Sequence, residues 1–151
     1  MEIRQFALTQ LSSLTQKKLI PDETKAFLYE KISLFLEWAY KTPKIQGLLE
    51  KILKELLNNE KKGILVSLFS QIEINAAFEA NVLFSRLTFL RILAKCLEDK
   101  NISVDSNVFQ NLMSLLSLVK LENLSDETSH NLIIILKILH SLLEVPHINF
   151  S

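Results

Sequence analysis

The sequence predicts an all-α fold made of stacked helix pairs. The evidence is a nine-residue phrase, a shorter phrase that alternates with it, and a scarcity of helix-breaking residues. The long phrase occupies residues 49–57, 89–97 and 135–143, in the order apolar, any, Lys or Arg, Ile, Leu, any, any, apolar, Leu. Its copies begin 40 and then 46 residues apart, which is the period expected of stacked units of two or three helices. Leu and Ile make up 45 of the 151 residues, against two Gly and three Pro, so little interrupts a helix.

The shorter phrase has the form apolar, Ser, Leu, apolar, and it recurs at residues 32–35, 66–69 and 113–116. Each copy precedes one copy of the long phrase, so the two phrases alternate in strict order. We therefore expect about seven helices, a leading helix followed by three antiparallel pairs. In each pair an A helix carries the short phrase and a B helix carries the long one. The three B helices should run parallel to one another as neighbours.

Local signals bound the first three helices. Apolar residues on one side of residues 2–17 predict the leading helix. Asp22 is a good N-cap for a second helix that runs to about residue 40. Thr42 can cap the third helix, and Pro43 at its first position loses no needed N–H, so this helix runs to about residue 58. The expected core residues of the second helix are Phe27, Leu28, Ile32, Phe35, Leu36 and Ala39.

The other four helices follow polar turns. The fourth starts near residue 63 and reaches at least residue 70. In residues 71–80, Ala and Glu favour helix while Asn75 can interrupt it, so this stretch stays open. The fifth and sixth helices are expected over residues 81–98 and 105–120. The seventh is expected over residues 125–144, where Ser125 can cap and acidic residues follow in the first turn.

In period and helix order, residues 22–144 resemble the HEAT and armadillo class of α-solenoids. The A helices lack the proline of a typical HEAT unit, and the glycine-rich start of a typical armadillo unit is missing. The chain therefore resembles a divergent member of the class. The resemblance implies a short curved stack in which the B helices line a concave surface. It also implies an activity of holding another protein's segment, without chemistry.

Composition sets the domain count and excludes several partners. The chain, residues 1–151, is long enough for a single helical-repeat domain with a sizeable core. Lys plus Arg and Asp plus Glu number 17 each, so the chain lacks the strong positive field that nonspecific nucleic-acid binding needs. The N-terminus has no apolar segment typical of a signal peptide, and the longest apolar run, residues 132–136, is far shorter than a membrane span. We expect an intracellular protein, cytoplasmic or nuclear, with no membrane or nucleic-acid partner.

No pattern in the chain indicates catalysis, metal binding or a cofactor. His130, His140 and His147 have no Cys or second His three or four residues away, as a zinc site on a helix would need. The chain has neither a Gly-x-Ser-x-Gly elbow nor a Gly-rich phosphate loop. Cys96 falls on the repeated apolar stripe, so we expect a buried small hydrophobe. The expectation is a protein that is not an enzyme and has no cofactor.

Cations at equivalent positions of the long phrase are candidate partner-binding residues. Lys51, Arg91 and Lys137 share one position. If the B helices lie side by side about 8–10 Å apart, these residues form a row, and Lys95 lies one turn further along. Such a row suits an acidic or carbonyl-rich segment of a partner. The alternative is an ordinary solvated face whose aliphatic stems cover the core.

Two aromatic residues near the end of the second helix are candidate interface anchors, because aromatic side chains concentrate binding energy. Trp38 can equally belong to the core. Tyr40 immediately precedes a loop, so it is the better surface candidate.

The seventh helix is apolar nearly all round, which is typical of a helix buried on several sides. The leading helix carries many polar residues and looks like a finished end of the stack, whereas the seventh looks unfinished. We expect Ile134 and Ile135 to meet more chain, a protein partner or a second copy in a homodimer. The chain would then be the N-terminal part of a longer protein or half of an assembly.

The leading functional hypothesis is a non-enzymatic protein–protein interaction or scaffold module. It would bind a partner segment, assemble through its C-terminal helix, or do both. The alternative is a compact helical bundle, Bcl-2-like or a dimerisation domain, that holds an amphipathic peptide or an apolar ligand. The repeated phrases favour the solenoid, and the seventh helix favours the bundle or the dimer. The Asn-Trp-Gly-Arg phrase of the Bcl-2-like family is missing from the chain.

Overall fold

The computed structural model describes residues 22–75, 77–102, 107–117 and 126–144. These residues form helices and connecting turns without strands, which confirms the all-α prediction for this part of the chain. The predicted helix over residues 2–17 and the proposed cap Ser125 lie outside the described residues. The six helices described are α2 (Asp22–Trp38), α3 (Pro43–Asn58), α4 (Lys62–Gln71), α5 (Ala80–Asp99), α6 (Asn107–Ser117) and α7 (Asp126–Glu144).

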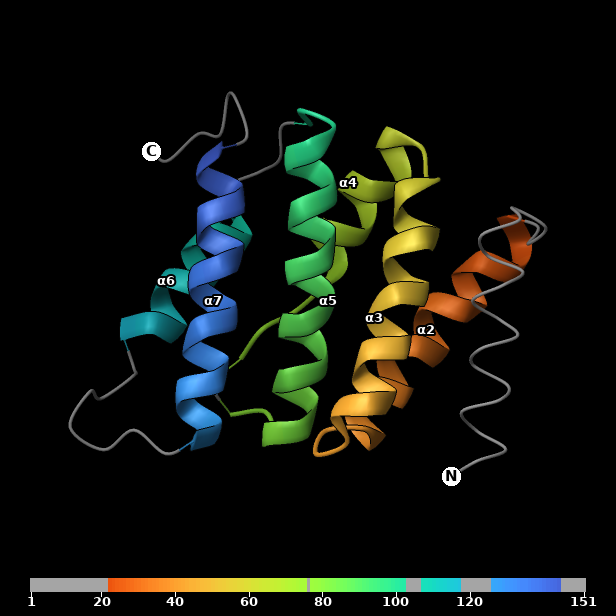
Figure 1. Cartoon of the computed structure of the whole chain (residues 1–151). Coiled ribbons are helices and arrows are strands. Elements are labelled where there is room, and N and C mark those ends of the chain that lie inside the picture. The colour runs from red at the N-terminus through yellow and green to blue at the C-terminus, as the bar shows by residue number, and fades with distance from the viewer. Residues whose placement is uncertain (1–21, 76, 103–106, 118–125, 145–151) are drawn as a thin grey trace.

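The helices form two layers (Figure 1). In one layer α3, α5 and α7 lie side by side and run in the same direction, and α3 and α7 both contact α5. Behind this row lie α2, α4 and α6. Helix α2 contacts α3 and α5, α4 contacts α5 and α6, and α6 also contacts α7. The parallel row of helices that carry the long phrase is as the sequence predicted. That this row is a segment of a repeat solenoid stays a prediction.

The core is centred on α5, which packs against α2, α3, α4 and α7. The fifth residue of each long phrase, Leu53, Leu93 and Leu139, is buried as expected. Cys96 is buried too, and desolvation raises the pKa of its thiol to about 11. The expectation that Phe27 belongs to the core is wrong, because its side chain is 56% exposed. It lies on the side of α2 opposite Ile32 and Leu36, which pack inwards, and Lys31 covers its ring.

The turn between α2 and α3 is held by a side chain that the sequence analysis did not single out. Thr42 occupies the N-cap position of α3 but makes no side-chain capping hydrogen bond. Instead the Gln46 side-chain amide donates to the carbonyl oxygens of Ala39 and Tyr40, at 2.7 and 2.6 Å. Pro43 begins the helix as predicted. The turn is therefore fixed from inside α3 and not by its cap.

The described residues between α4 and α5 are not helical. Of the two possibilities that the sequence left open, the interruption at Asn75 is the one observed. Its side-chain oxygen accepts a hydrogen bond from the backbone N–H of Ala77, at 2.9 Å, and its carbonyl accepts from Phe78 at 3.1 Å. Asn commonly makes such local turns in place of a helix. The result is a non-helical linker between α4 and α5, described at residues 72–75 and 77–79.

α5 ends in a Schellman motif. Asn101 has a positive φ of 53°, a conformation that Asn tolerates better than most residues. The N–H of Ile102 donates to the carbonyl of Leu97 at 2.9 Å, and that of Asn101 donates to Glu98 at 3.1 Å. Both apolar members of the motif, Leu97 and Ile102, are buried.

Polar side chains fasten the end of α3 to its neighbours. Lys100 Nζ donates to the carbonyls of Asn58 and Glu60, at 2.8 and 3.1 Å, which satisfies acceptors at this C-terminus. The buried Glu60 carboxylate pairs with Lys25 of α2 at 2.9 Å. This corner therefore joins α2, α3 and α5.

Candidate interaction surfaces

The predicted row of cations is partly used inside the fold. Lys51 on α3 and Lys137 on α7 are exposed, and neither forms an ion pair with another described residue. Arg91 on α5 is only partly exposed, because it pairs with Glu50 of α3. Burial lowers the pKa of the Arg91 guanidinium below its ordinary value. Arg91 thus bridges two B helices, which leaves less of its charge for a partner.

Lys95 is exposed but engaged on its own helix. Its ammonium group lies 2.9 Å from Glu98 and 3.4 Å from Asp99. The hydrogen bond to Glu98, and then that to Asp99, raise the pKa of Lys95. The row that could attract an acidic segment is therefore strongest at its two ends, Lys51 and Lys137. Whether these residues bind a partner stays a prediction.

Of the two aromatic candidates, Trp38 is the more exposed and Tyr40 the more buried, which is the reverse of the expectation. Tyr40 is partly buried, and its ring stacks on Phe84 of α5 with centroids 5.3 Å apart and planes 22° apart. Trp38 is 57% exposed and leans on Phe35 of its own helix, with centroids 5.4 Å apart. The preference for Tyr40 as the surface residue is therefore wrong. Tyr40 lies in the turn after α2, where Gln46 donates to its backbone carbonyl, and its ring packs inwards on α5.

Ile134 and Ile135, which we expected to meet a partner or more chain, are instead buried within the fold. Their side chains are 5% and 3% exposed, because α7 packs against α5 and α6. Other apolar residues of α7 reach the surface instead. They are Ile133, Leu136 and Leu143, at 52%, 48% and 60% exposure.

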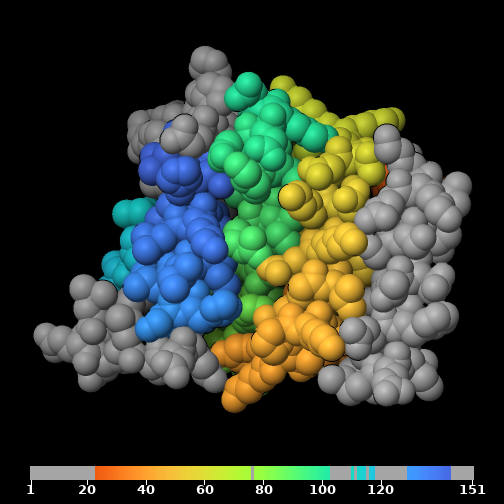
Figure 2. Space-filling view, in the orientation of Figure 1, coloured from red at the N-terminus to blue at the C-terminus, as the bar shows by residue number. Residues whose placement is uncertain are grey.

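These exposed residues form a regular stripe, which we call the α7 seam: Ile133, Leu136, His140 and Leu143. The steps between them are three, four and three residues, which is the spacing of a coiled-coil seam on one side of a helix. His140 is exposed like the rest. Figure 2 shows α7 on the surface at the opposite end of the row from α3. The seam therefore lies on an end helix of the row and not in its middle.

The α7 seam is not predictable from the sequence, although the spacing of its residues is visible there. A helix that is apolar on nearly all sides carries several overlapping stripes, and its pattern does not say which one faces solvent. Only the positions of α5 and α6 decide this. The histidines show no common site either, since His130 lies against the Phe84 ring at 5.9 Å, His140 belongs to the seam, and His147 is outside the described residues.

Neither a metal site among the described residues nor a relative points to a function for this chain. Within the described ranges, no three His, Cys, Asp or Glu side chains come together as a metal site would require. No helix of those ranges is long and apolar enough to cross a membrane. Comparison with protein families, curated proteins and solved structures finds no match. A functional hypothesis must therefore rest on the surfaces themselves.

Proposed function

We propose that this chain is a non-enzymatic protein-interaction module, a divergent HEAT- or armadillo-like stack that assembles through α7. The α7 seam carries the proposal. In such a stack each unit covers the apolar face of the unit before it. The seam is a face of this kind that no described helix covers.

Equivalent residues of the long phrase support this interpretation. Its last residue is Leu57 in α3, Leu97 in α5 and Leu143 in α7. Leu57 and Leu97 are fully buried, and each stands on a helix that has a further row helix beside it, whereas Leu143 is exposed. The position that is buried on α3 and α5, each of which is followed by another helix of the row, is therefore exposed on α7, the last helix of the row.

The occupant that we propose is a second copy of this chain. A two-fold dimer needs a surface that complements itself, and the seam has this property because its steps are the same from either end. Antiparallel pairing of two α7 helices sets Ile133 of one copy opposite Leu143 of the other. It also sets Leu136 opposite His140. Lys137, beside the seam, stays at the rim.

The pairing should be weak. The seam is one helix face only a few turns long, well below the area of a standard interface. We expect a dissociation constant on the order of 100 µM or above. The two Lys137 residues would lie near the two-fold axis with like charge, so added salt should tighten the dimer.

Analytical ultracentrifugation over about 10–500 µM tests the proposal around that constant. The wild-type chain should show reversible monomer–dimer exchange, and Ile133→Glu with Leu136→Glu should be monomeric at unchanged helicity. Ile64→Glu is a matched control, since Ile64 is an exposed apolar residue of α4. It should dimerise like the wild type.

A wild-type chain that stays monomeric at all these concentrations would contradict the proposal. So would a dimer that both seam substitutions leave intact. A monomeric chain that substitutions on α7 unfold would favour the compact-bundle alternative.

A further inference from the structure

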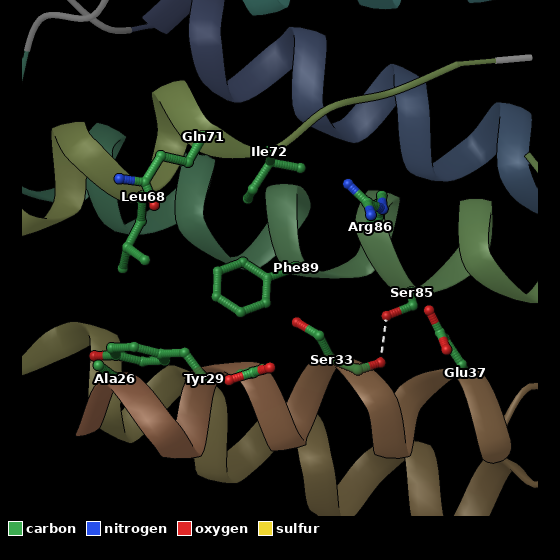
Figure 3. A pocket seen from close by; sticks show the side chains of 11 residues that line it. Ala26, Tyr29, Ser33, Glu37, Leu68, Gln71, Ile72, Ser85, Arg86 and Phe89 are labelled. Atoms are coloured by element: carbon green, nitrogen blue, oxygen red, sulfur yellow. Dashed lines mark hydrogen bonds between the residues drawn. The ribbon is translucent and has the colours of Figure 1, made fainter. Parts of the chain in front are cut away.

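A groove of about 320 Å³ lies between α2 and α4, in the layer of A helices (Figure 3). It exists because α2 and α4 each pack against α5 without packing closely on each other. Ser85 of α5 lies in its floor and donates to the Ser33 carbonyl of α2 at 2.6 Å. That bond holds the two helices together beneath the opening. The groove is thus part of the packed fold and not a gap between loose segments.

One end of the groove is apolar. Tyr29 of α2 and Phe89 of α5 meet edge to face with centroids 6.1 Å apart, and both residues are buried. Leu68 reaches towards them from α4. The volume lies at the lower limit of ligand pockets, so it suits one or two side chains of a larger partner.

The α2 wall of the groove is acidic. Glu30 and Glu37 line it, two turns apart on one side of the helix and about 10 Å apart along its axis. Neither carboxylate forms an ion pair with another described residue. Arg86 of α5, a cation that also lines the groove, is held by the linker after α4. It donates to the Glu73 carbonyl at 3.2 Å and lies over the Phe78 ring at 4.9 Å.

We propose that this groove binds a basic amphipathic helix of a partner protein, with an apolar side chain seated against Tyr29 and Phe89. Lys or Arg residues seven positions apart on that helix have the same axial spacing as Glu30 and Glu37, because both helices have the same rise. Charge complementarity selects the partner, and the apolar end of the groove anchors it. This site is independent of the α7 seam, so either surface can fail without the other.

A pair of synthetic helical peptides of about 18 residues tests the site, since shorter helices are marginal in water. They share one Leu on the binding face and differ only in carrying Lys or Glu at the two positions seven apart. Fluorescence anisotropy with the full chain should show binding of the Lys peptide, weakening as salt rises. The Glu peptide should bind roughly tenfold more weakly or worse.

Variants of the chain locate the binding. Glu30→Lys with Glu37→Lys should weaken the Lys peptide roughly tenfold or more and restore the Glu peptide. Ala26→Trp, at an exposed position lining the groove, should block both peptides by filling the space. Glu55→Lys is the matched control, because Glu55 lies on α3 and does not line the groove, and it should bind as the wild type does.

Equal binding of the two peptides would overturn the proposal, as would Lys-peptide binding that survives both Ala26→Trp and the double charge reversal. An apolar dye that Ala26→Trp displaces, with neither peptide binding, would assign the groove to a small apolar ligand instead. Circular dichroism of each variant keeps loss of folding apart from loss of binding.

Discussion

Helices α5 and α7 carry the same nine-residue phrase, yet their surroundings differ. α5 has α3 on one side and α7 on the other, with α2 and α4 behind it. α7 has α5 on one side and α6 behind it. The second residue of the phrase is the fully buried Leu90 in α5 but the exposed Leu136 in α7. Identical sequence patterns thus give different exposure, because burial is set by the number of neighbours.

The largest expected effect is that of a truncation at the centre of the row. Leu93→Ala should lower the free energy of unfolding by about 3–5 kcal/mol, since Leu93 is fully buried on the helix with most neighbours. Leu53→Ala on α3 should cost no more than Leu93→Ala. Urea denaturation measures both. A nearly neutral Leu93→Ala would break the comparison, because α5 would then not be the centre of the core.

A pair of substitutions at the last residue of the phrase sharpens the comparison directly. Leu97→Ala should cost about 2–4 kcal/mol, because it opens a cavity in a fully buried site. Leu143→Ala should cost less than about 1 kcal/mol in the monomer, because its side chain is mostly in water already. Melts at low protein concentration provide the measurement. Equal costs would mean that Leu143 is covered in solution.

Cys96, which is buried on α5, makes the free energy of unfolding depend on pH. Burial raises the pKa of its thiol from 9.0 to about 11 in the folded state, so the folded chain holds this proton more tightly than the unfolded chain. Its contribution is therefore fully present below pH 9 and is lost as the pH rises towards 11, by roughly 2 kcal/mol. The urea midpoint against pH should fall over that interval. The fall should be shallower in Cys96→Ala, and an unchanged slope would contradict the assignment.

Two hydroxyl groups of α5 give the smallest expected effects, with opposite signs. Thr88 Oγ1 is buried and has no hydrogen-bond partner among the described residues, so Thr88→Val should be neutral or stabilise by up to about 1 kcal/mol. Ser85 Oγ donates to the Ser33 carbonyl, so Ser85→Ala should destabilise by about 1 kcal/mol. Thermal denaturation compares the two, and a stabilising Ser85→Ala would cast doubt on the bond beneath the groove.

The sequence predicts the features that recur in each copy of the long phrase. It does not predict features that depend on how neighbouring helices are placed. The row of B helices, the burial of Leu53, Leu93 and Leu139, and the buried thiol of Cys96 all follow from the phrase and its period. The exposed side of α7 does not, because a helix with apolar residues all round has no preferred face until α5 and α6 are placed. The partial burial of Tyr40 does not follow from the sequence either, because its ring stacks on Phe84 of α5, 44 residues away along the chain.

The groove was beyond sequence analysis for a related reason. Its volume comes from the distance between α2 and α4, which α5 sets by packing against both. Glu30 and Glu37 look like ordinary solvated residues in the sequence, and Phe89 looks like any core residue. Their combination exists only in three dimensions.

The central position of α5 also determines how late in synthesis the chain can complete its core. α2 and α3 end at residue 58, but the helix against which both pack ends only at Asp99. At ordinary rates of translation the ribosome needs about 2–8 seconds to add the intervening residues. Throughout that interval the first pair exposes Ile32, Leu36 and Leu53 to solvent without the helix that later packs against the pair. A newly made chain is therefore most vulnerable to aggregation, and most in need of a chaperone, before α5 has emerged.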